Sequence, residues 1–231
     1  MSASPDVPAQ VSPDAGSADT PVPHPRSPRR DATRGRLMDA AVEVFAEVGF
    51  GAASVELVAE RAGFSRGAFY SNFASKEELL IAAVDRGMTG WIETVSRRVE
   101  ELTAGRERLS DEPVVLGGLV TEVLAGEAST RSWHLVQLEF RLLALRDPAV
   151  AAAQRALDAR LADRTIALVD TGLAALRRRR LLDATGTVAL LAGVYESVLN
   201  RVLLAGRPLD DVASEVREPM AAALLAISAE V

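Results

Sequence analysis

The sequence predicts an all-α protein, and three observations support this. Hydrophobic residues make up 48% and charged residues 25% of the 231 residues, the balance of a soluble protein with a sizeable core. Alanine, the strongest helix former, occurs 40 times, whereas only 4% of the residues are aromatic. Apolar residues recur at helical spacing, and neither strand-like alternation nor an internal repeat is evident.

The composition also excludes several kinds of site. The chain has no cysteine, which excludes disulfides, thiolate metal sites and cysteine nucleophiles, and its two histidines are too few for a multi-histidine metal site. We therefore expect no metal and no cofactor. The net charge is −6, yet binding to nucleic acid needs only a local basic patch.

No segment has the pattern of a secretory signal or of a membrane span. Residues 1–30 lack an apolar stretch, and the most apolar stretch, 188–204, contains Glu196, Asn200 and Arg201. We therefore expect a cytoplasmic protein that does not bind membranes.

Residues 1–30 form a separate compositional zone. Seven prolines fall within the first 28 residues, and no apolar periodicity is present. Such a segment buries too little apolar surface to offset the entropy of ordering it, so we expect a disordered tail. The basic residues at its end and just beyond are Arg26, Arg29, Arg30, Arg34 and Arg36. They form either a solvated surface or an arm that lies on a phosphate backbone.

Three helices are expected before a much longer fourth one. An apolar stripe predicts the first over 33–48, with glycine just beyond its end. Ser54 and Ser65 are good N-caps for two short helices, which we expect to reach Arg61 and Asn72.

Longer helices follow these three. Ser75 and Glu78 form a capping box at the start of the fourth, and Asp147-Pro148 is a strong helix start further along. Pro219 should kink or divide the last helix. The expected ranges are 75–103, 113–126, 130–146, 148–179, 184–205 and 209–229.

The segment 54–73 has the pattern of a helix-turn-helix. Gly63 permits the turn, and Ser65 caps the second short helix. Six apolar residues should seal its underside: Val55, Val58, Ala62, Phe64, Phe69 and Phe73. The other interpretation is a helical hairpin that only packs against the rest of the chain.

The opposite side of this second helix suits contact with a DNA groove. Arg66 can pair with guanine or with phosphate, Gly67 permits close approach, and Ala68 can touch a thymine methyl group. Tyr70 and Lys76 can donate hydrogen bonds to phosphates.

Two runs carry a resemblance to a known family. They are GRLMDAAVEVFAEVGF at 35–50 and SVELVAERAGFSRGAFYSNFASKEELL at 54–80. In their caps, turn glycine, recognition helix and following lysine they resemble the N-terminal domain of the TetR family of bacterial transcriptional regulators. Asn72 stands where that family often has His.

The resemblance implies a dimeric, all-helical regulator. A three-helix helix-turn-helix DNA-binding domain, which we place at 31–76, would precede a larger helical ligand-binding and dimerisation domain at 77–231. Arg66, Gly67 and Ala68 would face bases, and the other matching residues would contact the backbone. The expected DNA-binding residues are Ser54, Ser65, Arg66, Gly67, Ala68, Tyr70, Asn72 and Lys76.

Aromatic and polar residues share helix faces in the C-terminal part and suggest a pocket. A mainly apolar lining with few polar groups suits a small hydrophobic ligand. The candidate pocket residues are Trp91, Val95, Trp133, His134, Gln137, Phe140 and Arg141. Aromatic stripes at helical spacing are also typical of plain core, so both interpretations stay open.

Residues 188–204 are apolar nearly all round the expected helix, so both sides need cover. This predicts a homodimer through the last two long helices, 184–205 and 209–229, joined as a four-helix bundle. The other interpretation is a helix buried within one domain. The run Arg177–Arg180 is interpreted as charge at a helix C-terminus and not as a DNA site.

The function expected is that of a dimeric transcription regulator that binds a palindromic double-stranded DNA operator. As the family resemblance implies, it would be a repressor that a small-molecule effector releases from DNA. The rival is a helical small-molecule carrier, or a regulator that acts without DNA release. No glycine-rich phosphate loop, metal-ligand spacing or nucleophile elbow is present, so we do not expect an enzyme.

Overall fold

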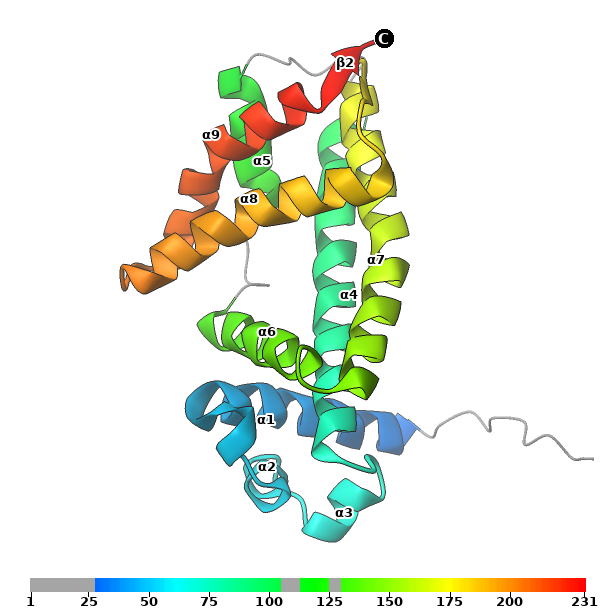
Figure 1. Ribbon diagram of the computed structural model, residues 1–231, viewed down its shortest axis with the longest axis vertical. Helices are drawn as coiled ribbons and strands as arrows, with labels where there is room; N and C mark the ends of the chain where they lie inside the picture. The colour runs from blue at the N-terminus through cyan, green and yellow to red at the C-terminus, as the bar shows by residue number, and fades with distance from the viewer. Residues whose placement is uncertain (1–27, 105–112, 125–129) are drawn as a thin grey trace, which may run out of the picture.

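The computed structural model describes residues 28–104, 113–124 and 130–231. Over these residues the fold is all-helical, as predicted, except for one short two-stranded sheet (Figure 1). Most of the expected disordered tail, up to residue 27, lies outside this description. The last two residues of the helix expected at 113–126 lie outside it as well.

The first helix is longer than predicted. α1 spans Pro28–Ala52, so residues 28–30, which composition assigned to the tail, are helical. The predicted end at residue 48 is close to Gly49, where φ is +77° and the backbone leaves helical geometry. A left-handed φ favours glycine because it has no Cβ.

Serines start the next three helices, as predicted. The hydroxyls of Ser54, Ser65 and Ser75 each accept the backbone N–H three residues further along, at 3.1 to 3.2 Å. Each bond satisfies a donor that has no partner inside its helix. The helices are α2 (Val55–Arg61), α3 (Arg66–Tyr70) and α4 (Lys76–Thr103).

One apolar core holds α1, α2, α3 and the start of α4 together and continues onto α6 and α7. We call residues 28–80, which build most of this core, the head. The most deeply buried side chains of the head are at most 1% exposed: Leu37, Ala41, Val44, Phe45, Val58, Ala59, Phe69, Phe73, Leu79 and Leu80.

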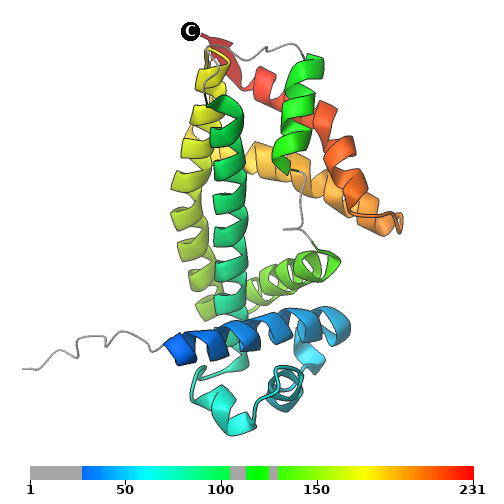
Figure 2. The ribbon, with the colours of Figure 1, turned by 180° about the vertical axis from the view of Figure 1, so that it is seen from behind.

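Five further helices complete the described chain: α5 (Pro113–Leu124), α6 (Arg131–Ala144), α7 (Pro148–Ala175), α8 (Ala184–Leu204) and α9 (Asp210–Ala226). α4 and α7 run side by side along the long axis of the molecule, as the two opposite views show (Figures 1 and 2). α6 packs across α1, and α8 and α9 form a hairpin whose second helix packs on α5.

The predicted ends of α7 and α9 are wrong, and α3 and α6 also end two residues earlier than predicted, at Tyr70 and Ala144. α7 stops at Ala175 and not at residue 179, because Arg177 takes a φ of +55° and breaks the helix. Arg178–Arg180 then form β1, which pairs antiparallel with β2 (Ser228–Glu230). α9 therefore ends at Ala226, and the expectation that no strand forms is also wrong.

The arginines of β1 bond within the chain. Arg178 Nε donates to Ser228 Oγ at 2.8 Å, and Arg180 Nε donates to Asp170 Oδ1 at 2.6 Å. The bond to Asp170 raises the pKa of the Arg180 guanidinium. These contacts give the basic run a structural role in joining the C-terminal end of the chain to α7.

Pro219 lies inside α9 and does not divide it. The side of the helix that carries Pro219 is exposed, so the carbonyl that loses its donor can bond to water.

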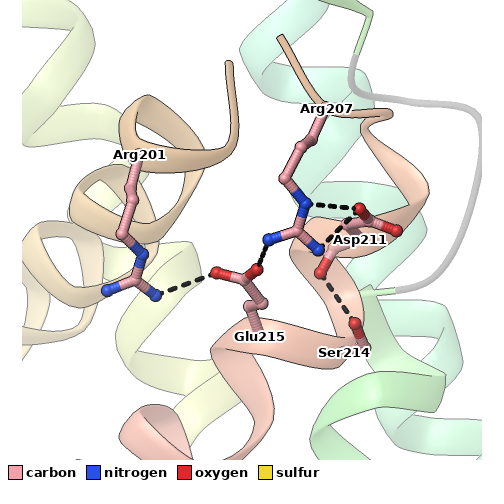
Figure 3. A network of polar contacts seen from close by, with 5 residues as sticks. All are labelled: Arg201, Arg207, Asp211, Ser214 and Glu215. Carbon is pink, nitrogen blue, oxygen red and sulfur yellow. Dashed lines mark hydrogen bonds and ion pairs between the residues drawn. The ribbon is translucent and has the colours of Figure 1, made fainter. Parts of the chain in front are cut away.

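Polar contacts fasten the turn between α8 and α9 (Figure 3). Arg207 donates from Nε to Asp211 Oδ2 at 2.9 Å and also bonds Glu215. The other oxygen of Glu215 accepts from Arg201 Nη2 at 3.0 Å, and Ser214 Oγ donates to the Asp211 carbonyl at 2.8 Å. Arg207 first, and then Arg201, lower the pKa of the Glu215 carboxyl by hydrogen bonding.

α8 is the one described helix that is long and apolar enough to cross a bilayer, and 22% of its apolar window is buried. Three polar residues on it bond to other helices: Glu196 to Arg141, Asn200 to His134, and Arg201 to Glu215. Those bonds fit a helix packed within a protein better than one in lipid.

Candidate nucleic-acid interface and ligand cavity

The turn between α2 and α3 has the geometry predicted for a helix-turn-helix. Gly63 takes a φ of +72°, and the N–H of Phe64 donates to the carbonyl of Ala59 at 2.8 Å. A Cβ on Gly63 would lie 3.0 Å from a guanidinium nitrogen of Arg36. The turn therefore favours glycine for its left-handed backbone, and a Cβ there would also crowd the Arg36 guanidinium.

The underside of this unit is sealed by the predicted apolar residues. Val58, Ala62, Phe69 and Phe73 are buried, and Val55 and Phe64 are half-buried. Phe69 is 0% exposed, so its side chain anchors α3 on the core.

The outer side of α3 carries Arg66, Gly67 and Tyr70, all exposed, with Ala68 half-buried beside them. The side chain of Arg66 is 64% exposed and pairs with Glu56 Oε1 at 2.7 Å. Its guanidinium lies 5.5 Å from the ring centroid of Tyr70, which is 49% exposed. We call Arg66, Gly67, Ala68 and Tyr70 the reading surface.

Four basic side chains of the head bond to carbonyls at or next to helix ends. Arg36 Nη2 donates to the Ala62 carbonyl at 2.8 Å, at the end of α2. Arg30 donates to the Ser71 carbonyl at 3.1 Å. Cations at a helix C-terminus satisfy free carbonyls and oppose the helix dipole.

Arg34 completes the end of α3 by donating to the carbonyl of Asn72. Its guanidinium also stacks 3.9 Å from the ring centroid of Phe73. The interpretation of Arg30, Arg34 and Arg36 as a solvated cluster or a phosphate-binding arm is therefore incomplete, because part of their role is to hold α2 and α3.

Lys76, which was predicted to contact a phosphate, faces the end of α1. Its Nζ donates to the carbonyls of Phe50 at 2.6 Å and of Ala53 at 2.8 Å, and it lies 4.3 Å from the Phe50 ring centroid. These bonds use two of its three donors in a half-buried position. The geometry favours a capping role over a direct contact with DNA.

Asn72 also turns inward. Its Nδ2 donates to the Ala68 carbonyl at 2.8 Å, and its Oδ1 is buried with no hydrogen-bond partner among the residues that the structure describes. In this position both polar atoms of the side-chain amide lie against the protein. Ser54 and Ser65 remain exposed, although their hydroxyls already cap α2 and α3.

Arg61, at the end of α2, links this helix to α1. It bonds Glu47 through both oxygens, at 2.9 and 2.7 Å, and Glu43 at 3.3 Å. These bonds raise the pKa of the Arg61 guanidinium, and the hydrogen bond from Arg61 lowers that of the Glu47 carboxyl.

A cavity of about 650 Å³ lies among α4, α5, α6, α7, α8 and α9. Its volume lies within the usual range for sites that take small molecules. It borders the core of the head and two smaller apolar clusters that pack α5 with α9 and with α7 or α8. The predicted residues that line it are Trp91, Val95, Trp133, His134, Gln137 and Arg141.

Phe140, the remaining predicted pocket residue, does not line the cavity. It is 1% exposed and belongs to the core that α6 shares with α1. Gln137 and Phe140 are only three residues apart on α6, but Gln137 faces the cavity and donates to Met88 Sδ at 3.1 Å.

Close approach of α6 to α4 depends on Gly87. A Cβ there would lie 2.3 Å from Cη2 of Trp133. Trp133 thus rests on the backbone of α4 and forms the wall of the cavity nearest the head. Trp91, one turn further along α4, lies 6.0 Å from Tyr195 of α8, measured between ring centroids.

Two polar bridges join α6 to α8 at the wall of the cavity. His134 Nε2 lies 2.9 Å from Asn200 Oδ1. Arg141 pairs with both oxygens of Glu196, one of them at 2.7 Å. The bond to Glu196 raises the pKa of the Arg141 guanidinium, against the opposing effect of burial.

Comparison with known proteins places this arrangement in a family. Residues 37–83 match the model described as bacterial regulatory proteins, tetR family. The HTH-type transcriptional activator FasR of Mycolicibacterium smegmatis is 30% identical over 183 residues, which cover 78% of this chain and 77% of that protein.

Solved structures agree in fold. The fatty acid degradation regulator FadR from Bacillus halodurans superposes with a TM-score of 0.66 at 21% identity, over 87% of this chain and 97% of that one. The multidrug binding protein EbrR, solved in complex with ethidium, gives a TM-score of 0.56 at 27% identity, over 86% of this chain and 99% of that one.

Proposed function

This chain belongs to the TetR family of bacterial regulatory proteins, and from that premise we propose that it is a homodimeric repressor whose release from DNA is controlled by a small, mainly apolar effector. It is a DNA-binding transcription regulator and not an enzyme. The operator, the direction of control and the effector are the proposed parts.

The continuity of α4 is the observation that carries this proposal. α4 starts at Lys76, next to the reading surface, and the same helix lines the cavity from Met88 to Thr103. A ligand that prefers one placement of α4 can therefore favour one placement of the head. On this basis we divide the chain at residue 76, with DNA binding before it and ligand binding and dimerisation after it.

The dimer would form through α8 and α9. Leu190, Gly193, Ser197, Arg201 and Leu204 lie along one face of α8 and are all exposed, and Arg201 pairs with Glu215 of α9. A second copy that covers this face would bury the apolar residues and give two reading surfaces. Two such surfaces suit a palindromic operator.

A fluorescence anisotropy titration with DNA from upstream of the gene tests the DNA-binding surface. We expect Arg66→Ala and Tyr70→Ala each to weaken binding by roughly tenfold, since each removes a contact with a base or a phosphate. Arg179→Ala is the control, because this exposed arginine lies in β1 at the opposite end of the molecule (Figure 1). Unchanged binding by the Arg66 and Tyr70 double variant would contradict the assigned surface.

Activation is a second candidate function, because the relative FasR is named as an activator. Transcription in vitro from the same promoter distinguishes repression from activation. Repression predicts fewer transcripts on addition of the protein, and activation predicts more. A chain that binds small molecules but no promoter DNA would instead be the carrier considered from the sequence.

A further inference from the structure

His134 is a buried polar group in the cavity wall that is only half satisfied. The residue is 4% exposed and lines the cavity. Its Nε2 meets Asn200 Oδ1 at 2.9 Å, whereas its Nδ1 is buried and has no hydrogen-bond partner within the described part of the chain. A buried polar atom without a partner is costly, and at a binding cavity it indicates a ligand group that completes the bond.

The Asn200 contact determines what kind of ligand group is missing. A carbonyl oxygen can only accept, so Nε2 of His134 carries the hydrogen in this pair. The neutral ring then has its lone pair on Nδ1, which is an acceptor. The partner that Nδ1 lacks is therefore a donor, either an O–H or an N–H group.

The charges around the cavity disfavour an anionic ligand. The charged residues in its lining are Arg141, Asp158 and Glu196, one cation against two anions. Both guanidinium NH₂ groups of Arg141 bond Glu196, and Asp158 accepts from Gln154 Nε2 at 2.7 Å. A carboxylate in the cavity would have to break the Arg141 pair or face an excess of negative charge.

We propose that the cavity takes a neutral, mainly apolar molecule whose one polar end donates a hydrogen bond to Nδ1 of His134, as an alcohol does. This rests on the proposed function only in taking the cavity as the effector site. The apolar walls hold the chain of the ligand, and His134 selects its polar end.

Three ten-carbon probes test the proposal: 1-decanol, decyl methyl ether and decanoate. The ether matches the alcohol in length but lacks the donor, and decanoate is anionic. Binding is read from tryptophan fluorescence, since both tryptophans of the chain, Trp91 and Trp133, line the cavity, and is checked by calorimetry. We expect 1-decanol to bind about tenfold more tightly than the ether, and decanoate more weakly than 1-decanol.

Two variants locate the effect. His134→Phe keeps the ring volume and removes the acceptor, so the alcohol and the ether should bind it within about twofold of each other. Leu138→Ala is the matched control, because Leu138 is exposed on the same helix outside the cavity lining, and this variant should keep the preference for the alcohol. If His134→Phe does not fold, the comparison of the three probes on the natural chain decides alone.

Equal binding of 1-decanol and the ether, tighter binding of decanoate, or no binding of any probe would overturn the proposal. So would a preference for the alcohol that survives in His134→Phe. DNA binding is measured separately without probe. A chain that prefers the alcohol but ignores promoter DNA would overturn the proposed function and support the ligand assignment.

Discussion

The head and the cavity region are packed in opposite ways. In the head, ten apolar side chains are at most 1% exposed, and basic side chains satisfy the ends of its helices. In the cavity region, two smaller apolar clusters and one side of the head core border a space of about 650 Å³, and two polar bridges join α6 to α8 beside it. A filled core has one arrangement, whereas a cavity leaves its walls room to adjust.

The difference assigns a role to each region. Under the proposed function, the head would present the reading surface in one geometry, and the cavity region would change with its contents. α4 belongs to both regions, so a shift of the cavity region would move the head as a rigid unit. Four predictions test this contrast, from the largest expected effect to the smallest.

One leucine in each region provides the strongest test. Leu80 is 0% exposed in the head core, whereas Leu168 lines the cavity. Leu80→Ala should lower the free energy of unfolding by about 2–5 kcal/mol, and Leu168→Ala by roughly 1 kcal/mol, because Leu168 has neighbours on fewer sides. Urea unfolding midpoints at constant slope measure both. Equal losses would mean that the cavity is closed in solution.

A pair of glycines on α4 tests the contact between the regions. Gly87→Ala puts a Cβ into the ring of Trp133 and should cost about 1–3 kcal/mol, with a change in tryptophan emission. Gly90→Ala, three residues further on in open space, is the control and should stabilise by up to about 1 kcal/mol through helix propensity. Thermal unfolding measures the stability of the two variants, and fluorescence spectra measure the change in tryptophan emission. A neutral Gly87→Ala would contradict the close approach of α6 to α4.

Glu56→Gln tests the reading surface of the rigid head. Glu56 pairs with Arg66 at 2.7 Å and repels phosphate, so its neutral amide should strengthen DNA binding by about two- to fivefold. The pair is exposed, so stability should hardly change. Anisotropy titrations at two salt concentrations measure the effect, which should shrink as salt rises. Glu60→Gln, an exposed neighbour on α2, is the control.

The smallest effect is expected at the surface bridge between α8 and α9. Because Arg207 and Arg201 lower the pKa of Glu215 in the folded chain, its contribution to stability is present above the ordinary value of 4.5. It is lost as the pH falls through the lowered value. Glu215→Gln should therefore be slightly less stable than the natural chain at pH 7 and equal to it in strong acid. Denaturation midpoints of both chains, measured from pH 7 down to strong acid, test this. A Glu215→Gln variant that is more stable than the natural chain at pH 7 would contradict it.

Local features of the head could be predicted from the sequence because they depend on neighbouring residues. Ser54, Ser65 and Ser75 bond N–H groups three residues away, and Gly63 supplies the turn between two of them. A capping serine acts the same way wherever its helix sits in the fold. The roles expected for Arg66, Gly67 and Ala68 at DNA bases came from the resemblance to the TetR family.

Side-chain directions that depend on distant partners could not be predicted. Lys76 turns toward carbonyls of Phe50 and Ala53, more than twenty residues earlier in the chain, and Asn72 turns inward. The same limit separates Gln137, on the cavity, from Phe140, in the core. Helical spacing places residues on faces, but it does not say which neighbour each face meets.

The strands were missed for the same reason. β1 is three arginines, and its partner β2 lies about fifty residues further along. Neither has the alternation of polar and apolar residues that marks a strand. Only the pairing, together with the bond from Arg178 to Ser228, makes this short sheet.

The β1–β2 pair also anchors both ends of the α8–α9 hairpin at one point, because β1 precedes α8 and β2 follows α9. Any rotation of the hairpin must pivot about this anchor. α8 is 21 residues long, or about 30 Å at the helical rise, so a swing of about 10° would carry its far tip through roughly 5 Å. The two subunits of a dimer built on α8 would then tilt against each other, and a small expansion at the cavity would become a much larger change in the span between the two heads.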